Sequence, residues 1–394
     1  MAHSTPTRRT LAALTATCTT AGLMLSACGT SSPEASTSDY KVGVLLQLSG
    51  AGSVYADSAQ AGTKAALQDV NSSKKAGVRF TSVVADAGAD AQSATTACSR
   101  LIQQDKVKAL VVFVPGPQLL ACNTLAKRQN IPILSLSSGA GNICATNLTG
   151  FGLVPNQQTL PVLDDLIAQG KKKWYFFGAD YSTPKTTISI AKPYLASKGG
   201  TTVGESYEPM GTTDYSQDIT KIVNAHPDVA FLNVIGNDDV ALEKQWAADP
   251  RTKGITRVDI LLGEGPAKAL GSAASGIWSS NVYFSSIPGS DNDTFKSQIQ
   301  AAGLKDSPDI NTYVSYLQVE ALASAVKSAG ADGPKVISAL GKTDITGPLG
   351  SQFQIRSGFS YQPVYLAQAQ ADGSFAIQKK SDPVDPKLAC SSAS

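Results

Sequence analysis

The sequence predicts an α/β protein with two lobes, each built on a doubly wound, largely parallel sheet. The first observation is that short apolar runs alternate with helical stretches from about residue 40 onward. These runs are almost continuously apolar, which is typical of parallel strands covered on both faces. The second observation is that the alternation occurs twice, in sets of similar size on either side of residue 156. A chain of 394 residues is long enough for two such domains.

The first set of elements begins with the apolar run 41–46, which ends in the turn sequence 49–52, Ser-Gly-Ala-Gly. A helix is predicted over 57–71, because Asp57 and Gln60 stand at the spacing of a capping box. The later elements follow as right-handed βαβ units. Their strands are predicted at 78–85, 109–114 and 133–136, and their helices at 91–104 and 119–128.

The second set repeats this order, and Gly199-Gly200 ends its first helix in the manner of a C-cap. In two facing lobes of this kind, a ligand is expected in the cleft beyond the carboxyl ends of the strands, where hinge closure traps it. Strands are predicted at 173–178, 201–204, 229–234, 259–263, 282–285, 351–355 and 362–369, and helices at 184–198, 214–225, 310–329 and 334–340.

The N-terminus carries export signals. Arg8 and Arg9 precede an apolar run, 11–25, that has the length of a signal-peptide core. This run ends in Leu-Ser-Ala-Cys, which resembles the bacterial lipobox and predicts lipidation of Cys28 after removal of residues 1–27. Residues 28–39 are then the anchor and a small, polar, flexible tether. We therefore expect an extracytoplasmic protein held to the cell membrane through the lipid on Cys28 alone.

Four cysteines remain in the exported part: Cys98, Cys122, Cys144 and Cys390. An even number in an exported protein favours disulfides, and four cysteines allow three pairings. We favour Cys122 with Cys144, because both are expected just past neighbouring strand ends, which leaves Cys98 with Cys390. The sequence does not decide between the pairings.

Composition argues against several classes of function. With 33 Lys and Arg against 31 Asp and Glu, the chain has no basic footprint for nucleic acid. The chain has two histidines, too few for a catalytic or metal site built on this residue type. Neither a Gly-x-Ser-x-Gly elbow nor a phosphate-binding Gly-rich Lys loop is found. We expect no enzyme activity, metal or cofactor.

Several segments, in order and spacing, resemble one known family. The segments KVGVLLQLSGAGSVYADSAQAGTKAALQDVN, DAQSATTACSRLIQQDKVKALVV, NIPILSLSSGAGN and TGPLGSQFQI resemble type I periplasmic binding proteins of ABC importers, in the leucine/isoleucine/valine-binding family. FFGADYSTPKT and LASKGGTTVGESYEPMGTTDYSQDITKI are similar to its urea- and short-chain-amide-binding branch. The resemblance covers residues 40–370.

The resemblance implies a Venus-flytrap fold whose lobes are joined by three hinge crossings, near 154–156, 285–288 and 345–350. It divides the chain into an N-terminal lobe, a C-terminal lobe and a tail, which are respectively residues 40–155 with 287–346, residues 156–286 with 347–381, and residues 382–394.

The implied function is solute capture for ABC permease subunits by a monomeric binding protein. The solute would be an amino acid, or urea or a short-chain amide, in the cleft. The alternative is a ligand sensor of the same fold that signals to a membrane receptor. An enzyme is the third hypothesis, disfavoured by the missing motifs.

The family's ligand contacts carry over to positions in both lobes. Glu264 matches an acidic residue that meets the ammonium of amino-acid ligands, so its position would report the ligand's charge. Tyr181 matches an aromatic that covers the ligand, and Asn233 ends the strand that leads to a second pocket position. The remaining implied contacts are Ser49, Tyr55, Pro115, Gly116, Ser137, Ser138, Ala140, Gly141, Asn237 and Asp238.

Overall fold

The computed structural model describes residues 39–137 and 144–386. Several predicted features lie outside these residues: the export signal, Cys28 with most of the tether, the contacts Ser138, Ala140 and Gly141, and residues 387–394 with Cys390. No helix within the described residues combines the length and apolar character needed to cross a membrane.

Among the described residues, the first sheet has eight strands in the order β11-β12-β13-β5-β4-β3-β1-β2. Its central strands are parallel, and β1 lies between β2 and β3, with Val44 paired to both Val84 and Val111. The parallel strands are β1 (Tyr40–Leu46), β2 (Phe80–Asp86), β3 (Ala109–Phe113), β4 (Ile133–Ser135) and β5 (Leu148–Gly150).

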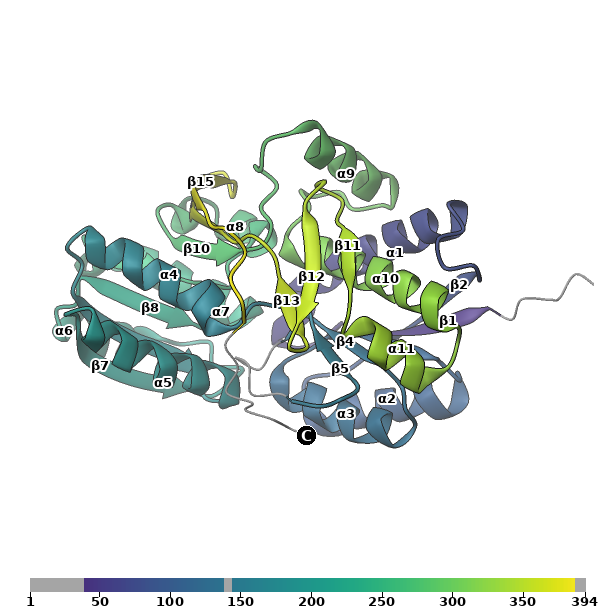
Figure 1. Cartoon of the computed structure of the whole chain (residues 1–394). Coiled ribbons are helices and arrows are strands. Elements are labelled where there is room, and N and C mark those ends of the chain that lie inside the picture. The colour runs from purple at the N-terminus through teal and green to yellow at the C-terminus, as the bar shows by residue number, and fades with distance from the viewer. Residues whose placement is uncertain (1–38, 138–143, 387–394) are drawn as a thin grey trace, which may run out of the picture. The chain divides into compact units, whose positions relative to one another are not determined.

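Helices cover both faces of the first sheet (Figure 1). Successive residues of β1 pack on opposite faces: Val44 joins the buried cluster under α1 and α10, whereas Leu45 joins the cluster under α2 and α3. This explains why the strand is apolar without alternation. The helices of this lobe are α1 (Ala56–Ser72), α2 (Ala91–Ser99), α3 (Gly116–Arg128), α9 (Ser290–Ala301), α10 (Ile310–Ala329) and α11 (Gly333–Leu340).

The second sheet has seven strands within the described ranges, in the order β15-β14-β10-β9-β8-β6-β7. They are β6 (Lys173–Ala179), β7 (Thr201–Glu208), β8 (Val229–Asn233), β9 (Thr256–Val258), β10 (Trp278–Asn281), β14 (Tyr365–Ala369) and β15 (Phe375–Lys380).

Helices again lie on both faces of this sheet (Figure 1). They are α4 (Pro155–Ala168), α5 (Ser182–Ser197), α6 (Ser216–Asn224), α7 (Gly236–Ala248) and α8 (Glu264–Leu270). The predicted fold of two doubly wound α/β lobes is confirmed.

The chain passes between the two sheets three times. The first passage follows β5 and the second follows β10, close to the predicted positions. The third lies between β13 (Phe359–Tyr361) and β14, not at 345–350 as predicted. Residues 347–361 therefore belong to the first lobe.

The reason for this difference is a set of short antiparallel strands. β11 (Asp344–Thr346), β12 (Gln352–Arg356) and β13 extend the first sheet beyond β5. Phe353 of β12 stacks on Phe151 with ring centroids 5.2 Å apart. The sequence of this Gly- and Pro-containing segment predicts where its strands lie. It does not predict which of the two sheets they join.

The favoured cysteine pairing is wrong. Cys98 on α2 is bonded to Cys122 on α3, with Cα atoms 5.6 Å apart. Cys122 lies within a helix rather than just past a strand end, and α2 packs beside α3 on one face of the sheet. Cys144 is disulfide-bonded as well.

Candidate ligand-binding site

A cavity of about 190 Å³ lies between the two lobes. This volume suits a molecule of about one ring, because a buried cavity of about 150 Å³ holds benzene. Its walls come from segments that follow strand ends in both sheets, as expected for doubly wound lobes. They include Phe113, Leu136 and Ser137 from the first lobe, and Tyr181, Asn233, Ile260 and Asn281 from the second.

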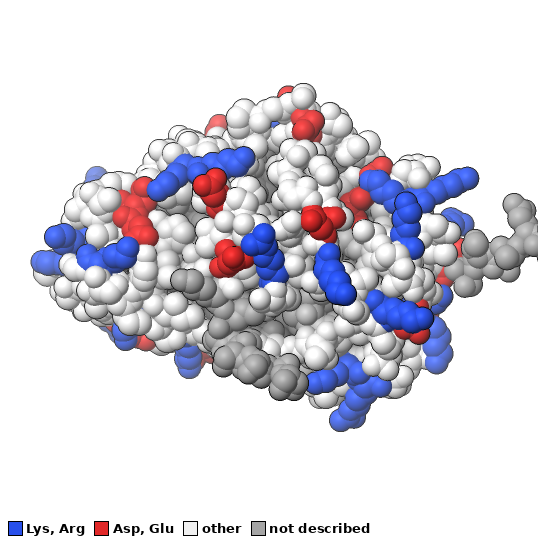
Figure 2. Space-filling model, in the orientation of Figure 1, with Lys and Arg blue, Asp and Glu red and all other residues white. Residues whose placement is uncertain are grey.

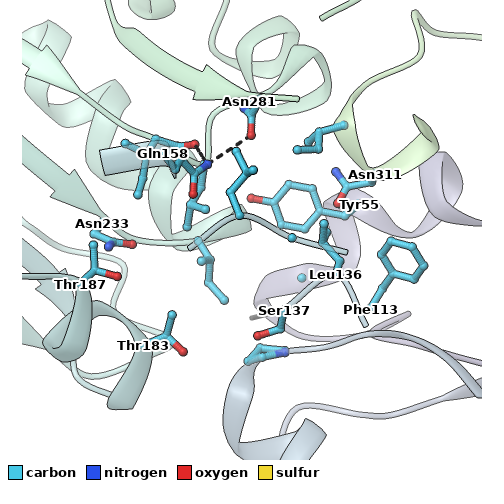
Figure 3. Close-up of a pocket in the computed structure, with 18 of the residues that line it drawn as sticks. Tyr55, Phe113, Leu136, Ser137, Gln158, Thr183, Thr187, Asn233, Asn281 and Asn311 are labelled. Carbon is cyan, nitrogen blue, oxygen red and sulfur yellow. Dashed lines mark hydrogen bonds between the residues drawn. The ribbon is translucent and has the colours of Figure 1, made fainter. Parts of the chain in front are cut away.

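The first lobe supplies a largely apolar wall. Phe113 ends β3, Leu136 and Ser137 follow β4, and Ile310 begins α10. Tyr55 closes this wall at the end of the short helix η1 (Ala51–Tyr55). Figure 3 shows the Tyr55 ring near the Asn311 side chain.

The second lobe supplies most of the polar groups. Gln158 and Thr159 lie on α4, Thr183 and Thr187 on α5, and Asn233 at the end of β8. Figure 3 shows Thr183, Thr187 and Asn233 together on the side of the cavity opposite Phe113 and Leu136.

The Gln158 amide is committed to the lobe itself. Its Nε2 donates to the carbonyls of Ile260 and Ser280, at 2.8 and 2.7 Å. By contrast, the hydroxyls of Thr159 and Thr183 have no hydrogen-bond partner among the described residues. A buried hydroxyl without a partner costs free energy, and both of these oxygens have almost no accessible surface.

No described residue that lines the cavity is Asp, Glu, Lys, Arg or His. On the face in Figure 2, Lys and Arg are interspersed with Asp and Glu. The described part of the wall therefore offers neutral hydrogen-bonding groups and apolar surface.

The two lobes contact each other at one side of this cavity. The backbone N–H of Gly236, at the start of α7, donates to Tyr55 Oη at 2.9 Å. The Asn237 Nδ2 donates to Ser53 Oγ at 3.1 Å. A Cβ on Gly236 would clash with the Ala51 carbonyl oxygen. These contacts define a closed arrangement of the lobes.

Glu264 is buried (4% exposed) and does not line the cavity. Its Oε1 accepts from the Ser285 N–H at 2.5 Å, and its Oε2 has no partner among the described residues. Burial raises the pKa of Glu264 to about 8, and the Asp309 carboxyl also raises it. Glu264 thus lies behind the wall.

Four predicted contacts line the cavity: Tyr55, Pro115, Ser137 and Tyr181. Tyr181 is the N-cap residue just before α5, and burial raises the pKa of its hydroxyl. Asn233 also lines it. Tyr55, Pro115, Ser137 and Tyr181 were expected at the site because the family resemblance implies them.

The structure does not bring the other described predictions to the wall. Gly116 begins α3, and Ser49 Oγ donates to Asp86 Oδ2 at 3.0 Å. Asp238 accepts from the Gly211 N–H at 2.7 Å, and Asn237 contacts the other lobe. Glu264 faces Ser285, as described above.

Sequence reasoning missed Gln158, Thr159, Thr183, Thr187 and Asn281. One available signal was the polar run 156–159, Asn-Gln-Gln-Thr, directly after the first crossing. Its last three side chains are buried, and buried polar groups in a helix need a partner or a function.

Gly236→Ala should weaken closure. The methyl group meets the Ala51 carbonyl, so small-angle scattering should show a larger radius of gyration than for the parent when a solute is bound. The matched control is Gly271→Ala, where φ is +58° rather than +61° and no atom lies near the added Cβ. Equal compaction of both variants would contradict the closure contact.

Glu264→Gln should change how stability depends on pH. The folded pKa of about 8 exceeds the usual 4.5, so between these values the folded state keeps a proton that the unfolded state loses. Stability then falls as pH rises, by at most about 1.4 kcal/mol per pH unit. Urea unfolding should show that the free energy of unfolding of the variant rises relative to that of the parent from pH 5 to pH 8. The control is Asp57→Asn, at an exposed site, which should leave the pH dependence of the free energy of unfolding as it is in the parent. A difference between Glu264→Gln and the parent that does not change with pH would contradict the buried, protonated state of Glu264.

Comparison with known proteins agrees with this architecture. Residues 39–374 match the model of the family described as periplasmic binding protein. A solute-binding protein of an ABC transporter from R. palustris, in complex with benzoate, has a TM-score of 0.80 and 21% identity, covering 90% of this chain and 99% of that one.

Two further solved structures have the same fold. An amino acid ABC transporter substrate-binding protein from Pseudomonas fluorescens Pf-5 has a TM-score of 0.78 and 18% identity, with coverages of 90% and 98%. A leucine binding protein from Thermotoga maritima has a TM-score of 0.76 and 18% identity, with coverages of 87% and 99%. Because the family model spans most of the sequence, this chain belongs to the periplasmic binding protein family.

Proposed function

We propose that this protein is the solute-binding component of an ABC importer and that it captures a small organic solute between its lobes. The observation that carries the proposal is the cavity of about 190 Å³ whose walls come from both lobes. A solute in that position contacts both lobes at once. Its binding energy therefore favours the closed arrangement over the open one.

The closed arrangement provides the signal that a permease needs. The contacts of Gly236 with Tyr55 and of Asn237 with Ser53 form only when the lobes meet. A permease that recognises the paired surfaces of the two lobes would distinguish the loaded protein from the empty one. The solved neighbours described as parts of ABC transporters support this role.

We expect this protein to bind a narrower range of solutes than the proteins of the same fold do together. Neighbours of the same fold are described in complex with benzoate and as leucine binding, and molecules of both sizes are compatible with this cavity. Of the amino acid and the amide or urea implied by the sequence, the amide is favoured, because Glu264 does not line the wall.

We also propose that the protein is exported and anchored by lipid. The support is the sequence 25–28, Leu-Ser-Ala-Cys, after an apolar run, followed by a polar segment up to residue 39. The first described strand begins directly afterwards, at Tyr40. This arrangement would leave the binding lobes outside the membrane on a short tether.

Binding should be detectable by thermal shift. The purified protein is screened against amides, urea, amino acids and small aromatic acids. A solute at about one hundred times its Kd adds about 2.7 kcal/mol to the free energy of unfolding, which raises the melting temperature by several degrees. The same solute should stimulate uptake by the cognate permease. Absence of a shift with every class would contradict the proposed function.

Cys28→Ser should release the protein from membranes, because a serine lacks the thiol that carries the lipid. Fractionation of expressing cells should find the parent with membranes and the variant in the soluble fraction. Cys18→Ser, ten residues earlier in the apolar run, is the matched control and should stay with the parent. A membrane-bound Cys28→Ser protein would disprove the anchor.

A further inference from the structure

We infer that the C-terminal tail, which the structure describes from Ser381 to Pro386, is a fourth connection between the lobes that limits hinge opening, and that a disulfide bond between Cys144 and Cys390 fastens it. This inference goes beyond the proposed function, because it concerns how far the lobes separate and not what they bind. Only the choice of Cys390 rests on the proposed export of the chain. Cys390 itself lies outside the described residues.

The tail leaves the second lobe and reaches the first. It follows β15, whose Lys380 pairs with Tyr365 of β14 in the second sheet. Further along, Asp385 meets Arg356 of β12 in the first sheet, where its Oδ1 accepts from Nη1 at 2.8 Å. Figure 1 shows this part of the chain, in yellow after β15, running between α4 and β13. The tail thus bridges the junction of the lobes in addition to the three passages described above.

Along this path the tail is hydrogen-bonded beside two of the three passages. In the third passage, the Val364 carbonyl accepts from the Ser381 N–H at 2.8 Å, and the Val364 N–H donates to Ser381 Oγ at 3.1 Å. Just after the first passage, Asn156 Nδ2 donates to the Asp385 carbonyl at 2.9 Å. The tail therefore braces segments whose backbone must bend or twist when two lobes separate about a hinge.

The most buried of these contacts is made by Gln157, in the first turn of α4. Its side chain is fully buried (0% exposed). Its Nε2 donates to the Val384 carbonyl of the tail at 2.7 Å and to the Ser360 carbonyl of β13 at 2.9 Å. Its Oε1 accepts from the Val154 N–H at 3.1 Å. One buried amide therefore joins the first passage, the first sheet and the tail, and loss of these partners would cost free energy.

The attachment of the tail lies next to the cavity wall. Pro155 and Gln158 line the cavity. The two residues between them, Asn156 and Gln157, hold the tail. The same turn of α4 therefore contacts the cavity with some side chains and the tail with others, so the tail supports the wall at the point where the first passage enters the second lobe.

The disulfide partner of Cys144 follows by elimination. Cys144 is disulfide-bonded, and Cys98 is bonded to Cys122. The remaining cysteines of the chain are Cys18, Cys28 and Cys390. The first of these lies in the proposed export signal, and the second is the proposed lipid carrier. Cys390 is therefore the partner that remains in the exported protein.

The described residues bring the tail within reach of Cys144. Arg356, which holds Asp385, lies on β12, and β12 pairs with β13, which pairs with β5. Two strand spacings amount to about 10 Å. Cys144 comes four residues before Leu148, the first residue of β5, and Cys390 comes four residues after Pro386. Four extended residues span up to about 14 Å, so the bond is sterically accessible.

Peptide mapping tests the bond. The protein is produced in an exporting host, purified and digested without reduction. A linked pair of peptides that contain Cys144 and Cys390 is expected, beside a second pair that contains Cys98 and Cys122. A bond from Cys144 to any other cysteine, or Cys390 with a free thiol, overturns the inference.

Hydrogen exchange tests the restraint on the hinge in the solute-free protein. The Gly236 N–H donates to Tyr55 Oη of the other lobe, so its exchange rate reports separation of the lobes. The double variant Cys144→Ser/Cys390→Ser releases the end of the tail. Its Gly236 amide should exchange about fivefold faster than that of the parent, which corresponds to losing one net hydrogen bond.

A chain that ends at Ser381 also loses the contacts of Gln157 and Arg356 with the tail, and its Gly236 amide should exchange faster still. Should this shortened chain not fold, the double variant alone decides. The matched control is Cys98→Ala/Cys122→Ala, because this bond joins two helices of one lobe; its Gly236 amide should exchange at the parent's rate.

Parent-like exchange of the Gly236 amide in the tail variants, or equal acceleration in the control, overturns the inference. Either result leaves the proposed function intact, because the thermal-shift screen measures solute binding to the parent protein. A screen that finds no solute, in turn, contradicts the proposed function and leaves the exchange measurement to decide the role of the tail.

Discussion

In each lobe, parallel strands deliver their carboxyl ends to one edge of a sheet, and everything at the site depends on the two edges facing each other. Side chains that follow β3 and β4 then meet side chains that follow β8 and β9 across one cavity. The hydrogen bond from Gly236 to Tyr55 closes that space. Neither lobe alone encloses this space, since its lining comes from both.

Some polar side chains of the cavity wall have hydrogen-bond partners within the lobe, and others have none among the described residues. The Gln158 amide holds two backbone carbonyls of the second lobe together and so gives α4 a fixed place beside β10. The oxygen of the adjacent Thr159 side chain is buried and has no hydrogen-bond partner among the described residues.

The buried carboxyl groups near the junction of the lobes lie outside the cavity lining. The Asp309 carboxyl of the first lobe acts electrostatically on Glu264 of the second, and burial raises the pKa of each. None of the described residues that line the cavity has a charged side chain.

The sequence by itself determined the two lobes, because continuous apolar runs record strands buried on both faces. The resemblance to a known family implied Tyr55, Ser137 and Tyr181 as contacts, and all three line the cavity. The tertiary structure alone decided three matters: Cys98 bonds to Cys122, residues 352–361 extend the first sheet, and Glu264 turns toward Ser285. The physical reason is that a local pattern reports burial and periodicity, whereas the surface that a buried side chain meets depends on packing between segments distant in the chain.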